Sequence, residues 1–324
     1  MSKILYKFCE KNTTPLQIID PLDLQAPYKI KNACINEGFF YLNHKNLIKN
    51  SLIQQVFQES KIFFSLPQKT KLKLKASQNN GMRGYIPFEA ENLNPKQRKR
   101  GDTKESYHIG RHVPLNSYEN QLFPMSKPNV FPDLNDKDFQ SLQNFQKIME
   151  EYHKQMQDIG HLTIKLIAKS INLPENFFDK YITRPLVTLR ICHYSKEISD
   201  PNSEAMGCGE HTDYGIITLL KTDQVEGLQI YLNDKWIDVP YIEDAFIVNI
   251  GDLLQRWTNN KFKSTLHRVV NKTGQERYSL PYFYEPNFDS KIEVLEQFID
   301  ENNPCLFPPI ISGEHLLDMY SKTY

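Results

Sequence analysis

The chain has 324 residues, of which 40% are hydrophobic and 24% are charged, as is typical of a globular protein that buries an ordinary hydrophobic core. Lysine and arginine together number 39, and so do aspartate and glutamate, so there is no net charge to attract nucleic acid or an anionic membrane. This balance favours a small-molecule or protein partner. We therefore expect a small-molecule substrate and no nucleic acid or membrane, and we infer no protein partner from the sequence.

The cysteines and the first residues bear on the cellular compartment. Five cysteines are scattered along the chain without a CxxC pair, at Cys9, Cys34, Cys192, Cys208 and Cys305. An odd, dispersed set favours reduced thiols in a cytosolic setting over a disulfide framework. The segment MSKILYKFCEKNTTP has no apolar run long enough for a signal peptide. The sequence thus predicts a cytoplasmic protein.

The first 65 residues read as alternating short strands and helices. A short strand is predicted at 16–20, and a helix at 27–37 that Gly38 ends, since glycine commonly follows a helix C-terminus. The apolar run at 39–42 is typical of a strand. A second helix is predicted over 46–65 from apolar residues at helical spacing.

Residues 68–135 look different, being rich in Lys, Asn, Gly and Pro with weak periodicity. A long irregular stretch in a compact chain is more often a functional cover than a core element, so we expect such a cover here. Within it lies a basic run of Lys96, Arg98, Lys99 and Arg100. We expect these charges to be solvated, with a lid over an acidic substrate as the alternative.

The second half of the chain begins with a helical pattern and continues with strands. Six apolar residues recur every three or four positions from Leu142 to Ile159, which predicts one long helix packed along a sheet. Short strands with turn signals follow, at 186–194, 215–221, 228–232, 236–239, 245–250, 264–271 and 277–284. Many short strands at this spacing suggest a sandwich, jelly roll or barrel. We therefore predict an α+β protein whose helical N-terminal part flanks an antiparallel β core.

A candidate metal site lies within the β-rich region. His211 and Asp213 are two positions apart, so in a strand their side chains point to one face. His267, on another β-rich run, can supply a third ligand. Two imidazoles and one carboxylate form the facial triad that suits Fe(II). A zinc site with bound water as nucleophile uses the same donors, and a His-X-Asp triplet alone also fits a packed histidine.

A candidate anion site begins at Arg277, ten positions after His267. Arg277 and Ser279 share one face of their strand, and Phe283 continues that face. A buried arginine is costly unless an anion meets it, and its planar fork binds a carboxylate through two parallel bonds. On the strand 186–194, Tyr194 belongs to a polar face that can add a phenolic hydrogen bond. A protein carboxylate as the partner of Arg277 is the simpler alternative.

These candidate sites and the segments around them resemble the iron- and 2-oxoglutarate-dependent dioxygenases related to isopenicillin N synthase. The similar segments occur in family order: GEHTDYGIITLL at 209–220, GLQIY at 227–231, WIDVP at 236–240, VNIGDLLQRWTNNKFKSTLHRVVN at 248–271 and RYSLPYFYEPN at 277–287. The segments NACINEGFFYLNH at 32–44 and FFSLPQKTKLKL at 63–74 are similar to the family's helical region. The resemblance covers nearly the whole chain.

The resemblance implies a double-stranded β-helix, or jelly roll, as the catalytic core. It implies an N-terminal family region at 14–135, a long connecting helix at 136–180, the dioxygenase core at 181–290 and a helical tail at 291–324. It also implies Fe(II) on His211, Asp213 and His267 as the metal ligands. The carboxylate of 2-oxoglutarate would meet Arg277, Ser279 and Tyr194, with dioxygen as second cosubstrate and ascorbate as a supporting reductant.

The reaction that the resemblance implies is hydroxylation or desaturation of a small organic substrate, with decarboxylation of 2-oxoglutarate to succinate. Candidate substrate-binding residues are Arg83, Tyr85, Tyr107 and Phe283, each of which also fits a packing role. Asn249, Gly251 and Asp252 match a structural stretch of the family.

One departure concerns the strand that carries Tyr194. Many plant members have Asn two positions before this tyrosine and Pro just after it, where this chain has Cys192 and Ser195. This argues against a plant hormone or flavonoid as the substrate. Two alternatives remain: an isopenicillin N synthase-type oxidase that does not consume 2-oxoglutarate, and an inactive family member that only binds ligands.

Overall fold

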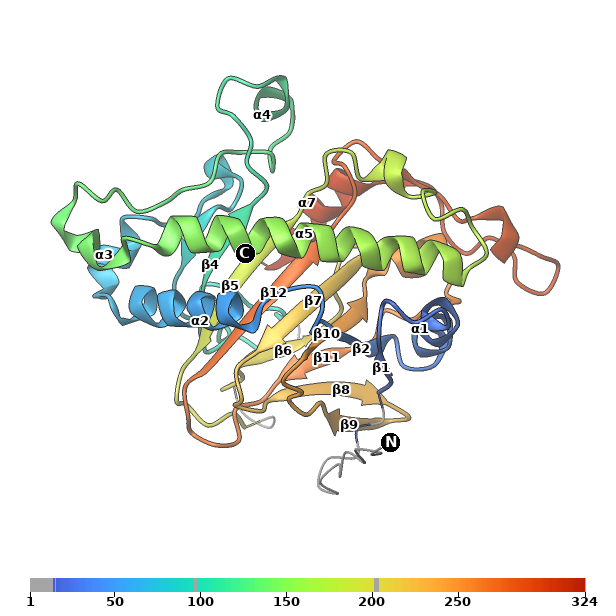
Figure 1. Ribbon diagram of the computed structural model, residues 1–324, viewed down its shortest axis with the longest axis horizontal. Coiled ribbons are helices and arrows are strands. Elements are labelled where there is room, and N and C mark those ends of the chain that lie inside the picture. The colour runs from blue at the N-terminus through green and yellow to red at the C-terminus, as the bar shows by residue number, and fades with distance from the viewer. Residues whose placement is uncertain (1–13, 15, 96–97, 201–203, 324) are drawn as a thin grey trace, which may run out of the picture.

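The computed structural model describes residues 14, 16–95, 98–200 and 204–323. Its centre is an eight-stranded sheet with strand order β1-β2-β10-β7-β12-β5-β4-β3, accompanied by a four-stranded sheet with order β6-β11-β8-β9 (Figure 1). Side chains from both sheets line one cavity, so the sheets face each other. This is the jelly roll of the prediction, and the mixed α+β class is confirmed.

The elements have the following bounds. The strands are β1 (Ile18–Ile19), β2 (Phe39–Asn43), β3 (Gly84–Ile86), β4 (Lys104–Gly110), β5 (Thr188–Tyr194), β6 (Cys208–His211), β7 (Ile217–Thr222), β8 (Leu228–Leu232), β9 (Lys235–Asp238), β10 (Ala245–Ile250), β11 (His267–Val269), β12 (Arg277–Tyr284), β13 (Lys291–Ile292) and β14 (Ile310–Ile311). The helices are α1 (Ala26–Asn36), α2 (Asn50–Ser65), α3 (Gln68–Leu72), α4 (Tyr118–Leu122), α5 (Phe145–Ser170), α6 (Asp252–Trp257) and α7 (Ser312–Thr323), with short 3-10 turns between them.

The long helix α5 lies across one face of the large sheet, with α2 beside it (Figure 1). Its predicted apolar stripe is confirmed, since Met149, Tyr152 and Met156 are fully buried. Antiparallel pairing of β5 with β12 places Leu189 directly opposite Tyr282, and both join this apolar layer. The opposite face of the same strands is therefore the one that faces the small sheet.

The start of the large sheet depends on a glycine. Gly38 follows α1 with a left-handed backbone (φ +67°), and its N–H donates to Ala33 O at 2.8 Å. A Cβ at this position would lie 2.3 Å from Lys263 O. Glycine thus ends the helix, as the sequence pattern predicts, and it also admits close approach of the chain before β11.

The predicted irregular cover at 68–135 is wrong for part of its length. The strands β3 and β4 extend the large sheet, and β4 pairs with β5 over its whole length, from Lys104 opposite Tyr194 to Gly110 opposite Thr188. The region before residue 135 therefore contributes strands to the same sheet as β5, β7, β10 and β12. All seven residues of β4 are buried, so no alternation of exposed and buried positions appears in the sequence.

The basic run in this region is matched by carboxylates of the protein. Arg98 is buried and lies 2.6 Å from Asp102, whereas Arg100 is partly exposed and binds Glu89 and Glu197. Lys96 lies outside the described residues. Across the described ranges, no helix is long and apolar enough to cross a membrane.

Candidate active site

The three predicted metal ligands come together where the small sheet faces the large one. His211 ends β6, His267 begins β11, and the two residues are direct partners across the paired strands. Asp213 Oδ1 lies 3.8 Å from His211 Nε2 and 3.7 Å from His267 Nε2. The three ligand atoms all lie within 4.8 Å of one another, which is close enough to hold a single ion.

Main-chain carbonyls orient both imidazoles. His211 Nδ1 lies 2.7 Å from Gly209 O, and His267 Nδ1 lies 3.1 Å from Thr265 O. A ring whose Nδ1–H donates to a carbonyl presents the lone pair of Nε2 to the metal. The edge of Phe39 packs on His267 at 5.5 Å between ring centroids. Burial, followed by the charge of His211, lowers the pKa of His267 to about 4, which favours its neutral, metal-binding form.

The carboxylate of Asp213 is held by two neighbouring side chains. Its Oδ2 accepts hydrogen bonds from Thr218 Oγ1 at 2.5 Å and Asn249 Nδ2 at 2.7 Å, which leaves Oδ1 for a metal. Burial alone would raise the pKa of Asp213, but His267, His211 and these two donors outweigh it and lower that pKa. Asn249 thus has the structural role that the resemblance implies, whereas Thr218 was not recognised from the sequence.

We expect Thr218→Val to weaken Fe(II) binding by about 10- to 100-fold, as is usual when a partner that orients a metal ligand is removed. The substitution nearly preserves volume but leaves Asp213 with one donor in place of two. Fe(II) affinity, measured by anaerobic titration, checks this expectation. Thr222→Val is the matched control, because Thr222 lies on the same strand without a hydrogen bond to Asp213. Equal affinities in the two variants would contradict the role of Thr218.

The donor set fits Fe(II). Two imidazoles and one carboxylate are the ligand set that suits Fe(II), and all three side chains line the cavity, where further ligands could bind. The metal, when bound there, supplies the oxidative chemistry with dioxygen and 2-oxoglutarate. The protein contributes the orientation of the ligands and a largely apolar wall, to which Phe39, Leu228 and Val269 belong.

The predicted anion site lies in the same cavity, on strands β12 and β5. Arg277 is 1% exposed, its Nε donates to Val225 O at 3.1 Å, and its Nη1 has no partner among the residues described. The guanidinium lies 4.8 Å from the ring centre of Tyr194, and Ser279 Oγ lies 3.4 Å from Tyr194 OH. A buried cation with an unsatisfied donor fits an anionic ligand. Arg277, Ser279 and Tyr194 therefore lie together, as predicted, and offer donors that suit an anionic group.

A second cavity adjoins the triad on the side of the C-terminal helix. It is lined by Glu91, Leu93, Arg190, His211, Thr212, Asp213, Tyr214, Phe283, Glu285, Tyr320 and Thr323. Phe283, a predicted substrate residue, lines both cavities. The last turn of α7 closes this pocket, with Tyr214 OH 2.9 Å from Thr323 Oγ1. The sequence prediction did not include Arg190, Glu285 or Tyr320.

The other three predicted substrate residues lie elsewhere. Tyr85 and Tyr107 face each other across β3 and β4 on the helix side of the sheet, where both rings pack on Phe63. Arg83 is 4% exposed and donates to Thr188 Oγ1 and Met125 O, and it lines neither cavity. We therefore assign the two tyrosines to the hydrophobic core and Arg83 to the packing behind the pocket.

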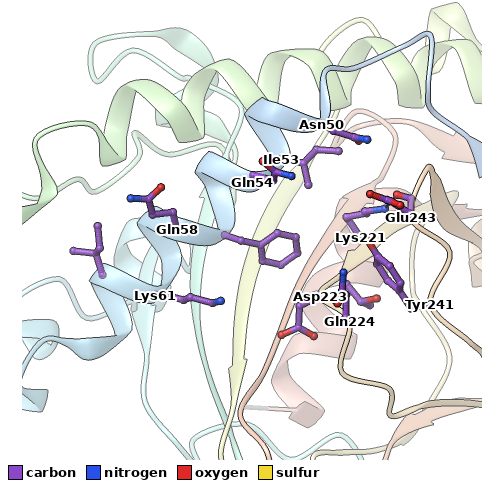
Figure 2. Close-up of a pocket in the computed structure, with 13 residues that line it drawn as sticks. Asn50, Ile53, Gln54, Gln58, Lys61, Lys221, Asp223, Gln224, Tyr241 and Glu243 are labelled. Carbon is purple, nitrogen blue, oxygen red and sulfur yellow. Dashed lines mark hydrogen bonds between the residues drawn. The ribbon is translucent and has the colours of Figure 1, made fainter.

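An open cleft of about 490 Å³ lies outside this site (Figure 2). It separates α2 from the segments 221–224 and 241–243, and it contains none of the triad. Lys221 at its edge is 3% exposed and donates to the carbonyls of Ile242, Glu243 and Ala245. The ammonium group of Lys221 therefore stabilises the segment that leads into β10, and we do not assign the active site to this cleft.

Comparison with known proteins agrees with this geometry. Residues 187–286 match the model of the 2OG-Fe(II) oxygenase superfamily, and residues 19–134 match that of the non-haem dioxygenase in morphine synthesis N-terminal region. A probable iron/ascorbate oxidoreductase of Dictyostelium discoideum is 35% identical over 297 residues, which are 85% of this chain and 80% of the relative. The chain belongs to the 2OG-Fe(II) oxygenase superfamily. A homoarginine-6-hydroxylase of Oryza sativa is 31% identical to this oxygenase over 310 residues, 94% of this chain and 90% of the relative.

Solved structures show the same relationship. A full-length protein of Neurospora crassa, solved in complex with α-ketoglutarate and thymine, superposes with a TM-score of 0.80 at 29% identity, and the match covers 95% of this oxygenase and 97% of the Neurospora chain. A putative 2OG-Fe(II) oxygenase family protein of Caulobacter crescentus superposes with a TM-score of 0.81 at 27% identity, with 96% and 99% covered.

The protein is therefore a dioxygenase that requires Fe(II), 2-oxoglutarate and dioxygen. The intact triad and the orphaned donor of Arg277 fit that activity. The alternative of an oxidase that does not consume 2-oxoglutarate is not favoured.

Proposed function

We propose that this oxygenase oxidises a small planar heterocycle with an amide-like edge, of which a pyrimidine base is the simplest example. The observation that carries the proposal is that Arg190 and Glu285 both line the cavity beside the triad. Arginine donates hydrogen bonds, and a carboxyl group accepts them or, when protonated, also donates. Such a pair matches adjacent C=O and N–H groups on the edge of a ring.

Aromatic side chains complete the pocket. The guanidinium of Arg190 lies 5.0 Å from the ring centre of Phe283, and Tyr214 lines the same cavity. Flat π surfaces favour a planar ligand over an aliphatic chain. The Neurospora protein was solved with thymine and with 5-formyluracil, which supports the choice of a pyrimidine for this related oxygenase.

The state of Glu285 separates two substrate classes. Burial, and then repulsion by Asp213, raises the pKa of Glu285 to about 8, which favours the neutral carboxyl group. A neutral acid suits an uncharged heterocycle, whereas an ionised one suits a cation such as the guanidino group of a homoarginine-like substrate. The relative that is named for homoarginine makes the cation the natural competitor.

We expect Glu285→Gln to keep most of the substrate-dependent succinate release, because an amide also donates and accepts. Glu285→Ala should lower it by about 5- to 100-fold, the effect of one lost buried hydrogen bond. The assay compares thymine, uracil and homoarginine with the same enzyme. Turnover of homoarginine alone, abolished in both variants, would refute the heterocycle proposal.

We also propose that the protein works in the cytoplasm and uses ascorbate as a supporting reductant. The four described cysteines are free thiols, three of them buried, and Cys9 lies outside the described residues. The name of the Dictyostelium relative supports ascorbate. Fluorescence microscopy of a tagged protein, and succinate release with and without ascorbate, test these two proposals.

A further inference from the structure

A buried cluster of charged side chains adjoins the cavity that holds the triad and Arg277. Lys104 Nζ lies 2.6 Å from Asp102 and 2.7 Å from Glu91, Arg190 Nη1 lies 2.8 Å from the other oxygen of Glu91, and Arg98 lies 2.6 Å from Asp102. All five residues are less than 9% exposed. Three cations and two carboxylates leave one positive charge in excess, buried beside a site that takes a dianion.

Lys104 and Arg190 are the members of this cluster that line the cavity together with the triad and Tyr194, and Lys104 is the one that is the direct strand partner of Tyr194. Two of its three N–H groups point to Asp102 and Glu91. The remaining one is close to Cys208 Sγ, at 3.6 Å, and a thiol sulfur is a weak acceptor. Burial alone would lower the pKa of Lys104, but Asp102 and Glu91 outweigh it and hold that pKa well above its ordinary value. The side chain is thus a charged donor with capacity for one further oxygen.

The strand register places Lys104 beside the anion site of Arg277. Tyr194 on β5 is the direct partner of Lys104 on one side and of Arg277 on the other. The two cations therefore flank one tyrosine at the same level of the sheet. Position 192, which is asparagine in many plant members of the family, holds a cysteine that lines the cavity, so strand β5 offers no amide donor at this position.

We propose that Lys104 is a second cation that binds 2-oxoglutarate, and that Glu91 positions it. Glu91 lines the neighbouring pocket and not the cavity of the cosubstrate. It bonds Lys104 with one oxygen and Arg190 with the other, so it joins the two compartments through a single carboxylate. The proposal rests on the use of 2-oxoglutarate by this oxygenase and is independent of the proposed substrate.

The test is anaerobic calorimetric titration of the Fe(II)-loaded protein with 2-oxoglutarate. We expect Lys104→Met to weaken binding by about 10- to 100-fold, the usual effect of a lost hydrogen bond to a charged group, with Fe(II) affinity unchanged. The variant should fold, because Asp102 keeps Arg98 and the N–H of Gly209, and Glu91 keeps Arg190. Lys104→Arg, which retains the charge, should restore part of the affinity.

Lys71→Met is the matched control. Lys71 is also buried and lies 2.6 Å from a carboxylate, that of Glu105, but it does not line the cavity. Its loss should leave 2-oxoglutarate binding unchanged. Glu91→Gln should weaken binding less than Lys104→Met and add nothing to it in the double variant, since Glu91 acts through Lys104.

Two outcomes would overturn the proposal. One is binding of 2-oxoglutarate by Lys104→Met within twofold of the wild type. The other is that Lys104→Met and Lys71→Met lose affinity for 2-oxoglutarate and for Fe(II) to the same extent. That result would show that the buried ion pairs of Lys104 have only a structural role. If Lys104→Met does not fold, Lys104→Gln and Lys104→Arg are compared. Equal affinities of these two variants for 2-oxoglutarate would also overturn the proposal.

Discussion

Replacing Arg277 by alanine is expected to weaken 2-oxoglutarate binding by about 30-fold or more. Arg277 is almost completely buried, and its Nη1 lacks a partner among the described residues, so the bound carboxylate completes its hydrogen bonds. Truncating one partner of a buried, hydrogen-bonded charge pair costs about 2–5 kcal/mol, which corresponds to that loss of affinity. Arg277→Lys should have an affinity for 2-oxoglutarate between those of the wild type and Arg277→Ala, because an ammonium group cannot form the two parallel bonds of a guanidinium.

The measurement for Arg277 is anaerobic titration of the Fe(II)-loaded protein with 2-oxoglutarate, followed by the weak charge-transfer band in the visible range. Arg184→Ala is the control, since Arg184 is 39% exposed in its side chain and pairs with Asp289 at the surface. Exposed ion pairs contribute little, so this variant should bind as the wild type does. Unchanged binding in Arg277→Ala would mean that the cosubstrate is anchored by other residues of the cavity.

The second large effect concerns the metal. Asp213→Ala should lower Fe(II) affinity and 2-oxoglutarate-dependent succinate formation by at least about 100-fold, because even the loss of a residue that only orients a ligand costs about 10- to 100-fold. Thr218 and Asn249 would then face a gap, and they cannot replace the carboxylate as an anionic ligand. Circular dichroism should show an intact fold, since the apolar core lies on the other face of the sheet.

Asp238→Ala is the control for Asp213. Asp238 lies on the edge strand β9, its side chain is 56% exposed, and it pairs with Lys272. Its removal should therefore change neither the iron content nor the turnover. Iron content after anaerobic reconstitution and succinate release are measured on both variants. Full iron occupancy in Asp213→Ala would contradict the assignment of the triad.

Much of the β core could be predicted from the sequence because its strands carry strong local signals. The bounds of β8, β10 and β12 agree with the prediction, since each strand is a short apolar or alternating run between turn residues. The two-residue spacing of His211 and Asp213, and of Arg277 and Ser279, also predicted side chains on a common face. For Arg277 and Ser279 one strand, β12, contains the whole signal, whereas Asp213 lies two residues beyond the end of β6.

The remainder depends on contacts between distant segments. β4 is buried on both faces even though its sequence, KESYHIG, is largely polar, because Lys104 and Glu105 find ion-pair partners elsewhere in the fold. The sequence around Lys104 and Glu105 contains no pattern that predicts these ion-pair partners. For the same reason Glu91, Lys104 and Thr218 were not predicted as site residues. Tyr85 and Tyr107 were misassigned because the face of a strand cannot be known until its register is known.

The way in which the metal ligands are held has a consequence for how the protein tolerates mutation. Both histidines are aligned by peptide carbonyls, those of Gly209 and Thr265, and a carbonyl oxygen persists whichever side chain its residue carries. The carboxylate ligand depends instead on the side chains of Thr218 and Asn249. A substitution of Thr218 or Asn249 therefore removes a hydrogen bond from the aspartate ligand, whereas a substitution of Thr265 leaves in place the carbonyl that orients His267.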